Sequence, residues 1–365
     1  MRKIKCLFYY LVAFTAVLQF VACDNKTDDR NDDAGSLLKL PKERVFILNE
    51  GSFEANNTTV DLYLPNGTTD KNEKFVGSVF EVQNSVKLGD TGMSMVEEDD
   101  AIFVSVYGSS LLVKTNKAGV LLDTIKFSQA DGQPRYLVAE NDKIYVSLYS
   151  GKVARVNAKT MKIEAYVIVG NNPEQMVEED NYLYVVNSGW GSDSTLSVVN
   201  LKTFNVEKTI NVAVNPFQIE EANDKIFVIS YGASYNYPLQ CVDIAKGTVE
   251  ELGTATIMAA DDNTLYLANS TTDWSTYTTT TTLFTYDALS GKINNESFVK
   301  LEGKAAAIAT SSVTMLEVNS DNGEIYIGTS DYVTNGTVYR FAKNGSLLEV
   351  IECSSLTPNT AIFVD

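Results

Sequence analysis

Seven related segments recur along the chain and constrain its fold more than any other feature. Each combines aliphatic, β-branched and aromatic residues over about four positions and then turns polar, which is typical of a β-strand followed by a turn. The copies are VFILNEG at Val45, IFVSVYG at Ile102, IYVSLYS at Ile144, LYVVNSG at Leu183, IFVISYG at Ile226, LYLANST at Leu265 and IYIGTSD at Ile325. Their starts lie 57, 42, 39, 43, 39 and 60 residues apart, which fits four-stranded propeller blades with two enlarged members.

A turn residue at a fixed distance before these segments defines the start of another strand. Pro134, Pro173 and Pro216 each stand ten residues before the next segment, and Gly92 holds the same place before the second copy. The clearest copy, residues 173–200, contains two strands, a wide loop and a third strand. We therefore expect four strands per copy: A after the proline or glycine, B at the recurrent segment, and then C and D.

The two ends of the chain complement each other. The C-terminal TPNTAIFVD, residues 357–365, resembles the A strands of other copies, but the chain stops before a B strand can follow. The first copy, in contrast, begins directly at its B strand. We therefore predict an all-β, seven-bladed β-propeller over residues 43–365, with the ring closed by the C-terminal strand in the first blade. Two separate sandwiches would leave both end strands unpaired.

The N-terminus has the pattern of a lipoprotein signal peptide. Residues 1–22 contain a basic start and an apolar core, and the small Ala22 precedes Cys23. Phe20 departs from the leucine that is most common at that position of the bacterial lipobox. We expect lipidation of Cys23, with ordinary secretion as the alternative, and an acidic tether over residues 23–42.

The proline, the B strand and the V-V-N or V-V-D type C strand together resemble the YVTN or YncE-type seven-bladed propellers over residues 43–365. With the lipoprotein start and acidic tether, the chain is similar to the surface lipoproteins that include the corrinoid-capturing BtuG proteins. That resemblance implies a lipid-anchored protein on the cell surface of the outer membrane. It also implies cobalamin or another corrinoid as ligand and a TonB-dependent outer-membrane transporter as partner.

Charge and composition exclude several functions. Without the signal peptide the chain has 47 acidic and 26 basic side chains, which disfavours nucleic acid and anionic lipid surfaces as partners, so membrane contact is expected through the anchor only. The absence of histidine removes His-dependent catalysis and metal binding. We expect no enzyme activity, catalytic residue, catalytic cofactor or metal.

Two smaller sets of residues have plain structural interpretations. The acidic clusters at Glu97–Asp100 and Glu178–Asp180 fall in successive A-to-B turns, so solvated turn chemistry is the favoured interpretation over a metal site. Cys241 and Cys353 fall in different copies, so we expect two buried, unbridged cysteines.

Because successive strands of a blade alternate in direction, all B-to-C loops are expected at one rim of the ring, together with the D-to-A connections. Those loops contain most of the candidate ligand-binding aromatic residues, including both tryptophans. They are Phe53, Tyr107, Tyr149, Trp190, Tyr231, Tyr235, Tyr237, Trp274, Tyr277 and Tyr332. Large aromatic rings on polar loops favour a ligand with broad planar or apolar faces. For Tyr107 and Tyr149, at strand ends, packing between blades is the alternative.

Polar candidates complete the predicted site. Gln175 and Asn187 offer amide donors and acceptors, as an amide-fringed ligand requires. Arg135 could contact a phosphate, and a local salt bridge is the equal alternative. The loop of residues 187–193, which contains Trp190, departs from the repeat, so we place function there.

These features lead to three hypotheses. The first is capture of cobalamin or a related corrinoid on the aromatic rim and delivery to the transporter. The second is a glycan-binding accessory lipoprotein that uses the same aromatic residues. The third is a scaffold propeller that binds another protein. The enlarged segments, residues 66–86 and 271–282, are compatible with a ligand wall or a transporter dock, and the sequence does not choose between them.

Overall fold

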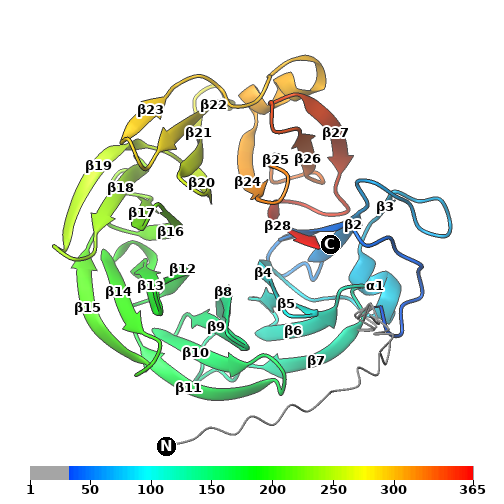
Figure 1. The fold of residues 1–365 in the computed structure, drawn as a ribbon, viewed down its shortest axis with the longest axis horizontal. Helices are drawn as coiled ribbons and strands as arrows, with labels where there is room; N and C mark the ends of the chain where they lie inside the picture. The colour runs from blue at the N-terminus through cyan, green and yellow to red at the C-terminus, as the bar shows by residue number, and fades with distance from the viewer. Residues whose placement is uncertain (1–32, 365) are drawn as a thin grey trace, which may run out of the picture. The chain divides into compact units, whose positions relative to one another are not determined.

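The computed structural model describes residues 33–364, which form a ring of seven four-stranded antiparallel sheets (Figure 1). The predicted signal peptide, Cys23 and most of the tether lie outside the described residues. The seven B strands begin within two residues of the predicted positions. The all-β, seven-bladed propeller is therefore confirmed.

The strands are named by their place in a blade, from the centre of the ring outward. The A strands are β28 (Pro358–Val364), β4 (Gly92–Glu98), β8 (Pro134–Glu140), β12 (Pro173–Glu179), β16 (Pro216–Ala222), β20 (Ile257–Asp261) and β24 (Ser312–Asn319). The B strands are β1 (Arg44–Asn49), β5 (Ala101–Val106), β9 (Lys143–Leu148), β13 (Tyr182–Asn187), β17 (Lys225–Ser230), β21 (Thr264–Asp273) and β25 (Glu324–Ser330). The C strands are β2 (Thr59–Tyr63), β6 (Leu111–Asn116), β10 (Lys152–Asn157), β14 (Thr195–Asn200), β18 (Pro238–Asp243), β22 (Thr278–Asp287) and β26 (Thr337–Phe341). The D strands are β3 (Phe75–Val76), β7 (Leu121–Lys126), β11 (Lys162–Ile168), β15 (Asn205–Asn211), β19 (Thr248–Thr254), β23 (Lys292–Asn294) and β27 (Leu347–Glu352).

The C-terminal strand closes the ring. β28 pairs antiparallel with β1 from Arg44↔Val364 to Asn49↔Pro358, so the first blade combines the two ends of the folded chain. Polar bonds reinforce the seam between the seventh and first blades: Lys74 pairs with Glu349 at 2.6 Å, and the Ser354 amide donates to Asp61 at 2.8 Å. The predicted closure is confirmed. The C-terminal strand thus completes the first blade as a four-stranded sheet like the other six.

Burial follows the position of a strand in its blade. Every residue of β1 and β5 is buried, because a B strand has a neighbouring strand on each side and a neighbouring blade against each face. In the outer strands β11 and β15 exposed residues alternate with half-buried or buried ones, as in strands with one solvent face. Apolar clusters join adjacent blades, for example Phe103 of the second blade with Leu137 and Val146 of the third. The core is therefore a circle of interfaces between blades.

Residues 33–42, expected as tether, belong to the folded unit. Leu38 is buried in the core of the first two blades, and Arg44 pairs with Asp33 at 2.5 Å. The side chain of Gln83 accepts from the Leu37 amide at 2.8 Å. The folded unit thus extends before residue 43, because an apolar residue and a matched charge occur within the acidic segment.

The two enlarged segments lie on different rims. In the first blade, residues 66–73 form the turn between β2 and β3, on the rim opposite the B-to-C loops, and α1 (Val79–Asn84) then packs against β2. In the sixth blade, residues 271–282 lengthen the hairpin of β21 and β22 on the rim of the B-to-C loops. Only the sixth-blade enlargement therefore extends the wall of the predicted ligand face.

The remaining local predictions have mixed outcomes. Cys241 and Cys353 are both free, as expected, but Cys241 is half-buried. The side chain of Asn200, at the end of a C strand, accepts from the Lys202 and Thr203 amides and so holds the turn to the D strand. None of the helices within residues 33–364 has the length and hydropathy that crossing a membrane requires.

Candidate functional site

The rim formed by the B-to-C loops, here called the B–C rim, displays large aromatic side chains. Six of the ten predicted aromatic residues are more than half exposed, from 62% for Tyr332 to 82% for Tyr277. Those six are Phe53, Trp190, Tyr235, Trp274, Tyr277 and Tyr332. Folding therefore leaves a set of rings on the surface that core packing does not explain.

Two of the exposed rings, Phe53 and Trp190, are joined by two half-buried tyrosines into a continuous series across the first four blades, which we call the arc. Ring centroids are 6.4 Å apart between Phe53 and Tyr107, 5.4 Å between Tyr107 and Tyr149, and 6.1 Å between Tyr149 and Trp190. The last two pairs are edge-to-face, a favourable geometry for aromatic rings. Tyr107 and Tyr149 are half-buried between exposed ends, so the packing alternative holds for these two.

A buried ion pair supports the arc from below. Arg135, the second residue of β8, donates from Nε and a terminal nitrogen to Glu174 Oε2 at 2.9 and 2.7 Å. Its guanidinium lies 5.2 Å from the Tyr107 ring centre and 4.6 Å from that of Tyr149. Glu174 also accepts from the Tyr149 hydroxyl at 2.6 Å and from Ser188 Oγ at 3.0 Å. The pair thus fixes one arc ring and the start of the Trp190 loop.

The environment of Arg135 decides between its two predicted roles. Burial disfavours its charge, yet the Glu174 carboxylate raises the pKa of Arg135 above its ordinary value. Burial and the same carboxylate raise the pKa of Tyr149. With its charge matched inside the protein, Arg135 is the local salt bridge of the alternative interpretation, and a phosphate contact has no support from this geometry.

Asn187 is not available to a ligand. It is fully buried, and its side-chain oxygen accepts from the Gly170 amide at 3.1 Å. Its nitrogen donates to Ser197 Oγ at 3.0 Å and to Thr195 Oγ1 at 3.1 Å. The prediction of a rim ligand was wrong for this residue, because the end of β13 turns its side chain into the blade.

The fifth blade contributes a separate tyrosine cluster. Tyr231 stacks on Phe217 with centroids 4.4 Å apart, and Tyr235 and Tyr237 approach it at 6.0 and 5.6 Å. Burial raises the pKa of Tyr231 to about 12. Tyr231 and Phe217 also line the central channel. The predicted loop residues are therefore brought together here, around a phenylalanine that the sequence interpretation omitted.

The centre of the ring is a channel of about 700 Å³. Glu220 of β16 and Glu317 of β24 lie deep in it, and burial raises the pKa of each to about 8. Gln175 lines the channel between blades: it donates to Glu220 at 3.4 Å and accepts from the Ile219 amide at 3.1 Å. Gln175 thus faces the channel but is occupied in joining the fourth blade to the fifth.

The sixth and seventh blades form a second cavity, which we call the groove. It measures about 600 Å³ and lies between the hairpin tip with Trp274 and Tyr277 and the seventh-blade loop that contains Asp331 and Tyr332. Tyr332 lines both the groove and the channel. The structure therefore separates the predicted rim residues into the arc, the fifth-blade tyrosine cluster and the groove, in this order around the ring.

Several rim rings sit on strained backbone. Six aromatic residues among residues 33–364 have positive φ, and five of them belong to the B–C rim: Trp190 (52°), Tyr235 (53°), Tyr237 (50°), Tyr277 (55°) and Tyr332 (62°). The left-handed region is unfavourable for bulky side chains, by roughly 1–2 kcal/mol per residue. Such conformations concentrate at functional sites, so this pattern marks the B–C rim as a candidate binding surface.

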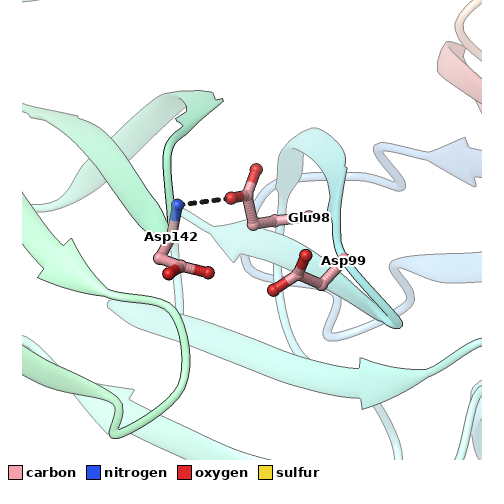
Figure 2. Close-up of side chains that lie close together, drawn as sticks. All are labelled: Glu98, Asp99 and Asp142. Carbon is pink, nitrogen blue, oxygen red and sulfur yellow. Dashed lines mark hydrogen bonds between the residues drawn. The ribbon is translucent and has the colours of Figure 1, made fainter. Parts of the chain in front are cut away.

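An acidic cluster on the opposite rim has a structural explanation. Carboxylate oxygens of Glu98, Asp99 and Asp142 lie within 4.8 Å of one another, as Figure 2 shows. Glu98 accepts from the Asp142 amide at 2.6 Å, and Lys159 Nζ lies 2.7 Å from Asp142 and 3.7 Å from Asp99. Lys159 supplies the positive charge that balances these carboxylates, and the hydrogen bond from the Asp142 amide to Glu98 is typical of a turn. We therefore infer no metal site from this cluster.

The sequence interpretation gave a salt bridge as one role of Arg135 but did not identify Glu174 as its partner, and it missed Glu220, although the repeat itself signals both. Arg135 and Glu174 both follow the A-strand proline, so opposite charges occupy equivalent positions in adjacent blades. Glu220 stands four residues after its proline, where the preceding copies have Val138 and Val177. Aligning the copies position by position would have exposed both departures.

Comparisons with known proteins add the fold alone. No family model matches the chain, and no curated protein matches it significantly in sequence. Among solved structures, a hydrazine synthase of Kuenenia stuttgartiensis is similar with a TM-score of 0.60 at 12% identity, over 72% of this chain and 86% of that one. The computationally designed Ika8 protein is similar with a TM-score of 0.54 at 12% identity, over 75% and 91% of the two chains. At this identity neither comparison extends to function.

Proposed function

We propose that this protein captures a corrinoid, such as cobalamin, on the B–C rim and delivers it to an outer-membrane transporter of the TonB-dependent class. The observation that carries the proposal is the set of six exposed rim aromatics, of which four stand on left-handed backbone. A strained backbone conformation that leaves an aromatic ring exposed gains no stability from core packing. It is consistent with a ring that contacts a ligand. The protein is a binding protein in this proposal, not an enzyme.

The arc is the part of the rim that best fits a corrinoid. Phe53, Tyr107, Tyr149 and Trp190 provide apolar faces and edges along four blades. A macrocycle offers a broad face to such rings. Its amide fringe can bond to polar groups of the channel lining, such as Glu50. Because adjacent blades hold the arc rigidly, little conformational entropy is lost on binding.

The anchor and the delivery step rest on the resemblance to surface lipoproteins. Cys23, the proposed site of lipidation, lies outside the described residues. The strong negative charge of the chain, with 47 acidic residues, disfavours direct adsorption to anionic surfaces and leaves the anchor as the proposed membrane contact.

Isothermal titration calorimetry with cyanocobalamin tests the proposal on the chain that begins after Cys23. We expect measurable binding, which Trp190→Ala weakens because the exposed ring ends the arc. Tyr166→Ala is the matched control, since Tyr166 is an exposed aromatic residue of the outer strand β11. Absence of heat at about micromolar protein would contradict the proposal. Equal affinity of the wild type and Trp190→Ala for cyanocobalamin would show that the arc does not form the binding site.

A further inference from the structure

The groove between the sixth and seventh blades is lined mainly by residues that carry hydroxyl groups. Ten of its sixteen lining residues are serine or threonine, and no lysine or arginine lines it within residues 33–364. Its volume of about 600 Å³ falls within the range of about 300–1,000 Å³ typical of small-molecule sites. The cavity is thus large enough for a ligand and rich in hydroxyl groups.

Exposed aromatic rings border the hydroxyl groups. Trp274 and Tyr277 at the hairpin tip are 75% and 82% exposed, and Tyr332 on the facing loop is 62% exposed. All three line the groove. Tyr277 and Tyr332 have positive φ, so the backbone is strained on both sides of the cavity. The rings therefore face the groove from two blades, not from one flexible loop.

Paired hydroxyl groups make the hairpin wall a fixed surface. Thr272 and Thr279 bond across the strands at 2.9 Å, and Thr276 and Thr278 bond at 2.7 Å. A hydroxyl oxygen engaged in one such bond still has lone pairs to accept from a ligand. The wall thus offers regularly spaced hydroxyl groups with little freedom to lose on binding.

The single carboxylate of the groove is held by hydrogen bonds from its own loop. Asp331 accepts from the Val333 and Thr334 amides at 2.9 and 2.7 Å and from Thr334 Oγ1 at 2.8 Å. The amides of Thr334 and Val333 lower the pKa of Asp331, which therefore remains ionised and fixed in the loop. An anionic ligand would meet this charge without any basic residue to offset it, so the groove favours a neutral ligand.

We propose that the groove binds a neutral oligosaccharide. The carbon–hydrogen faces of sugar rings pack on Trp274, Tyr277 and Tyr332, and the sugar hydroxyl groups bond to the threonine and serine wall. A neutral sugar needs no charged partner, which matches the lining. This site is independent of the corrinoid proposal, because the Phe53–Trp190 arc lies on other blades.

The chain has two tryptophans, one in each region, which allows the sites to be read separately. In Trp190→Phe the remaining indole is Trp274, so fluorescence reports on the groove. We would titrate this variant with maltotriose, cellotriose, mannotriose and triacetylchitotriose. We expect at least one to shift the emission, with a Kd between about 1 μM and about 1 mM. Adding Tyr277→Ala should weaken that binding about tenfold or more, because an exposed ring face is lost.

Controls separate the groove from the arc and from unfolding. Tyr235→Ala in the same background should leave saccharide affinity unchanged, since Tyr235 does not line the groove. Thermal melts should match among the variants, because both tyrosines are exposed. The proposal is overturned if none of the four sugars shifts the emission at about 10 mM, or if Tyr277→Ala binds as the parent does. The proposal would also be overturned if the fluorescence of Trp190 in Trp274→Phe reported saccharide binding of equal affinity, because Trp190 lies in the arc. Failure of cyanocobalamin to bind would contradict the corrinoid proposal and leave the groove proposal intact.

Discussion

The arc and the groove present similar residue types on one rim, but they are built differently. In the arc, rings contact one another across blades, and a buried Arg135–Glu174 pair fixes them from below. In the groove, rings from two blades face a cavity, and hydroxyl pairs with one capped carboxylate make up the walls. The arc is therefore a supported surface, and the groove is an open pocket.

This difference shows how one fold can hold two kinds of site. The strands that position both regions are copies of the same repeat, so the scaffold does not distinguish them. The distinction comes from residues that depart from the repeat, such as Glu174 beneath the arc and the lengthened hairpin beside the groove. Function on a propeller therefore follows loop and rim chemistry, not blade geometry.

The largest expected effect concerns the support of the arc. Glu174→Ala leaves Arg135 buried without its partner and should lower the free energy of unfolding by about 3–5 kcal/mol. Asp331→Ala, at the exposed loop of the groove, should lower it by only about 1 kcal/mol. Urea unfolding of the two variants gives the comparison. The double variant Arg135→Met/Glu174→Leu should recover most of the loss; a double variant as unstable as Glu174→Ala would contradict this account.

The second effect is the pH dependence of the central channel. Because burial raises the folded-state pKa of Glu220 and Glu317 to about 8, above the value of 4.5 for an exposed glutamate, folding is favoured by their protonated forms. Their contribution is complete below about pH 4.5 and is lost as the pH rises through about 8. As the pH rises between these limits, the free energy of unfolding of Glu220→Gln should fall less than that of the wild type, by on the order of 2 kcal/mol.

Chemical unfolding at several pH values measures this difference. If the free energy of unfolding changed with pH equally in the wild type and in Glu220→Gln, the carboxyl group of Glu220 would not be protonated in the folded state, and this interpretation would be wrong. Saccharide binding in the groove is a useful contrast: it should change little between about pH 6 and about pH 9, because the pKa of Asp331 is lowered, away from this range.

The third effect tests whether the two regions bind different ligands. Phe53→Ala should weaken cyanocobalamin binding about tenfold, since it removes an exposed end of the arc. Trp274→Ala should change the same affinity by less than about threefold. Calorimetry on both variants gives the comparison. A larger loss for Trp274→Ala would place the corrinoid in the groove and reverse our assignment.

The smallest effect concerns backbone strain on the groove side. At Tyr332, φ is 62°. Glycine adopts this left-handed conformation without a steric cost, whereas alanine still pays the steric cost of its Cβ atom. Tyr332→Gly should therefore be more stable than Tyr332→Ala by about 1 kcal/mol, measured by thermal or urea unfolding. Both should lose saccharide binding, which would separate the role of the ring from the strain. Equal stability of the two variants would show that the loop relaxes.

The sequence by itself predicted the number of blades, their strand order and the closure by the C-terminal strand. These features follow from local alternation and from repetition, since each B strand signals itself through its own residues and the two end strands require each other. It also predicted which loops share a rim, because strand direction alternates within a blade. Phe53, Trp190, Trp274 and Tyr332 were identified as rim residues in this way, and all four are exposed there.

Only the tertiary structure decided what each rim residue does. Asn187 and Trp190 are three positions apart, yet one is fully buried and the other is 73% exposed. Arg135 and Glu174 meet because adjacent blades bring their A strands together, and burial in the channel, where the fifth and seventh blades place Glu220 and Glu317, raises the pKa values of these two side chains. Such contacts join residues far apart in the chain, so local pattern could not assign them. The division of one predicted rim into an arc and a groove has the same cause.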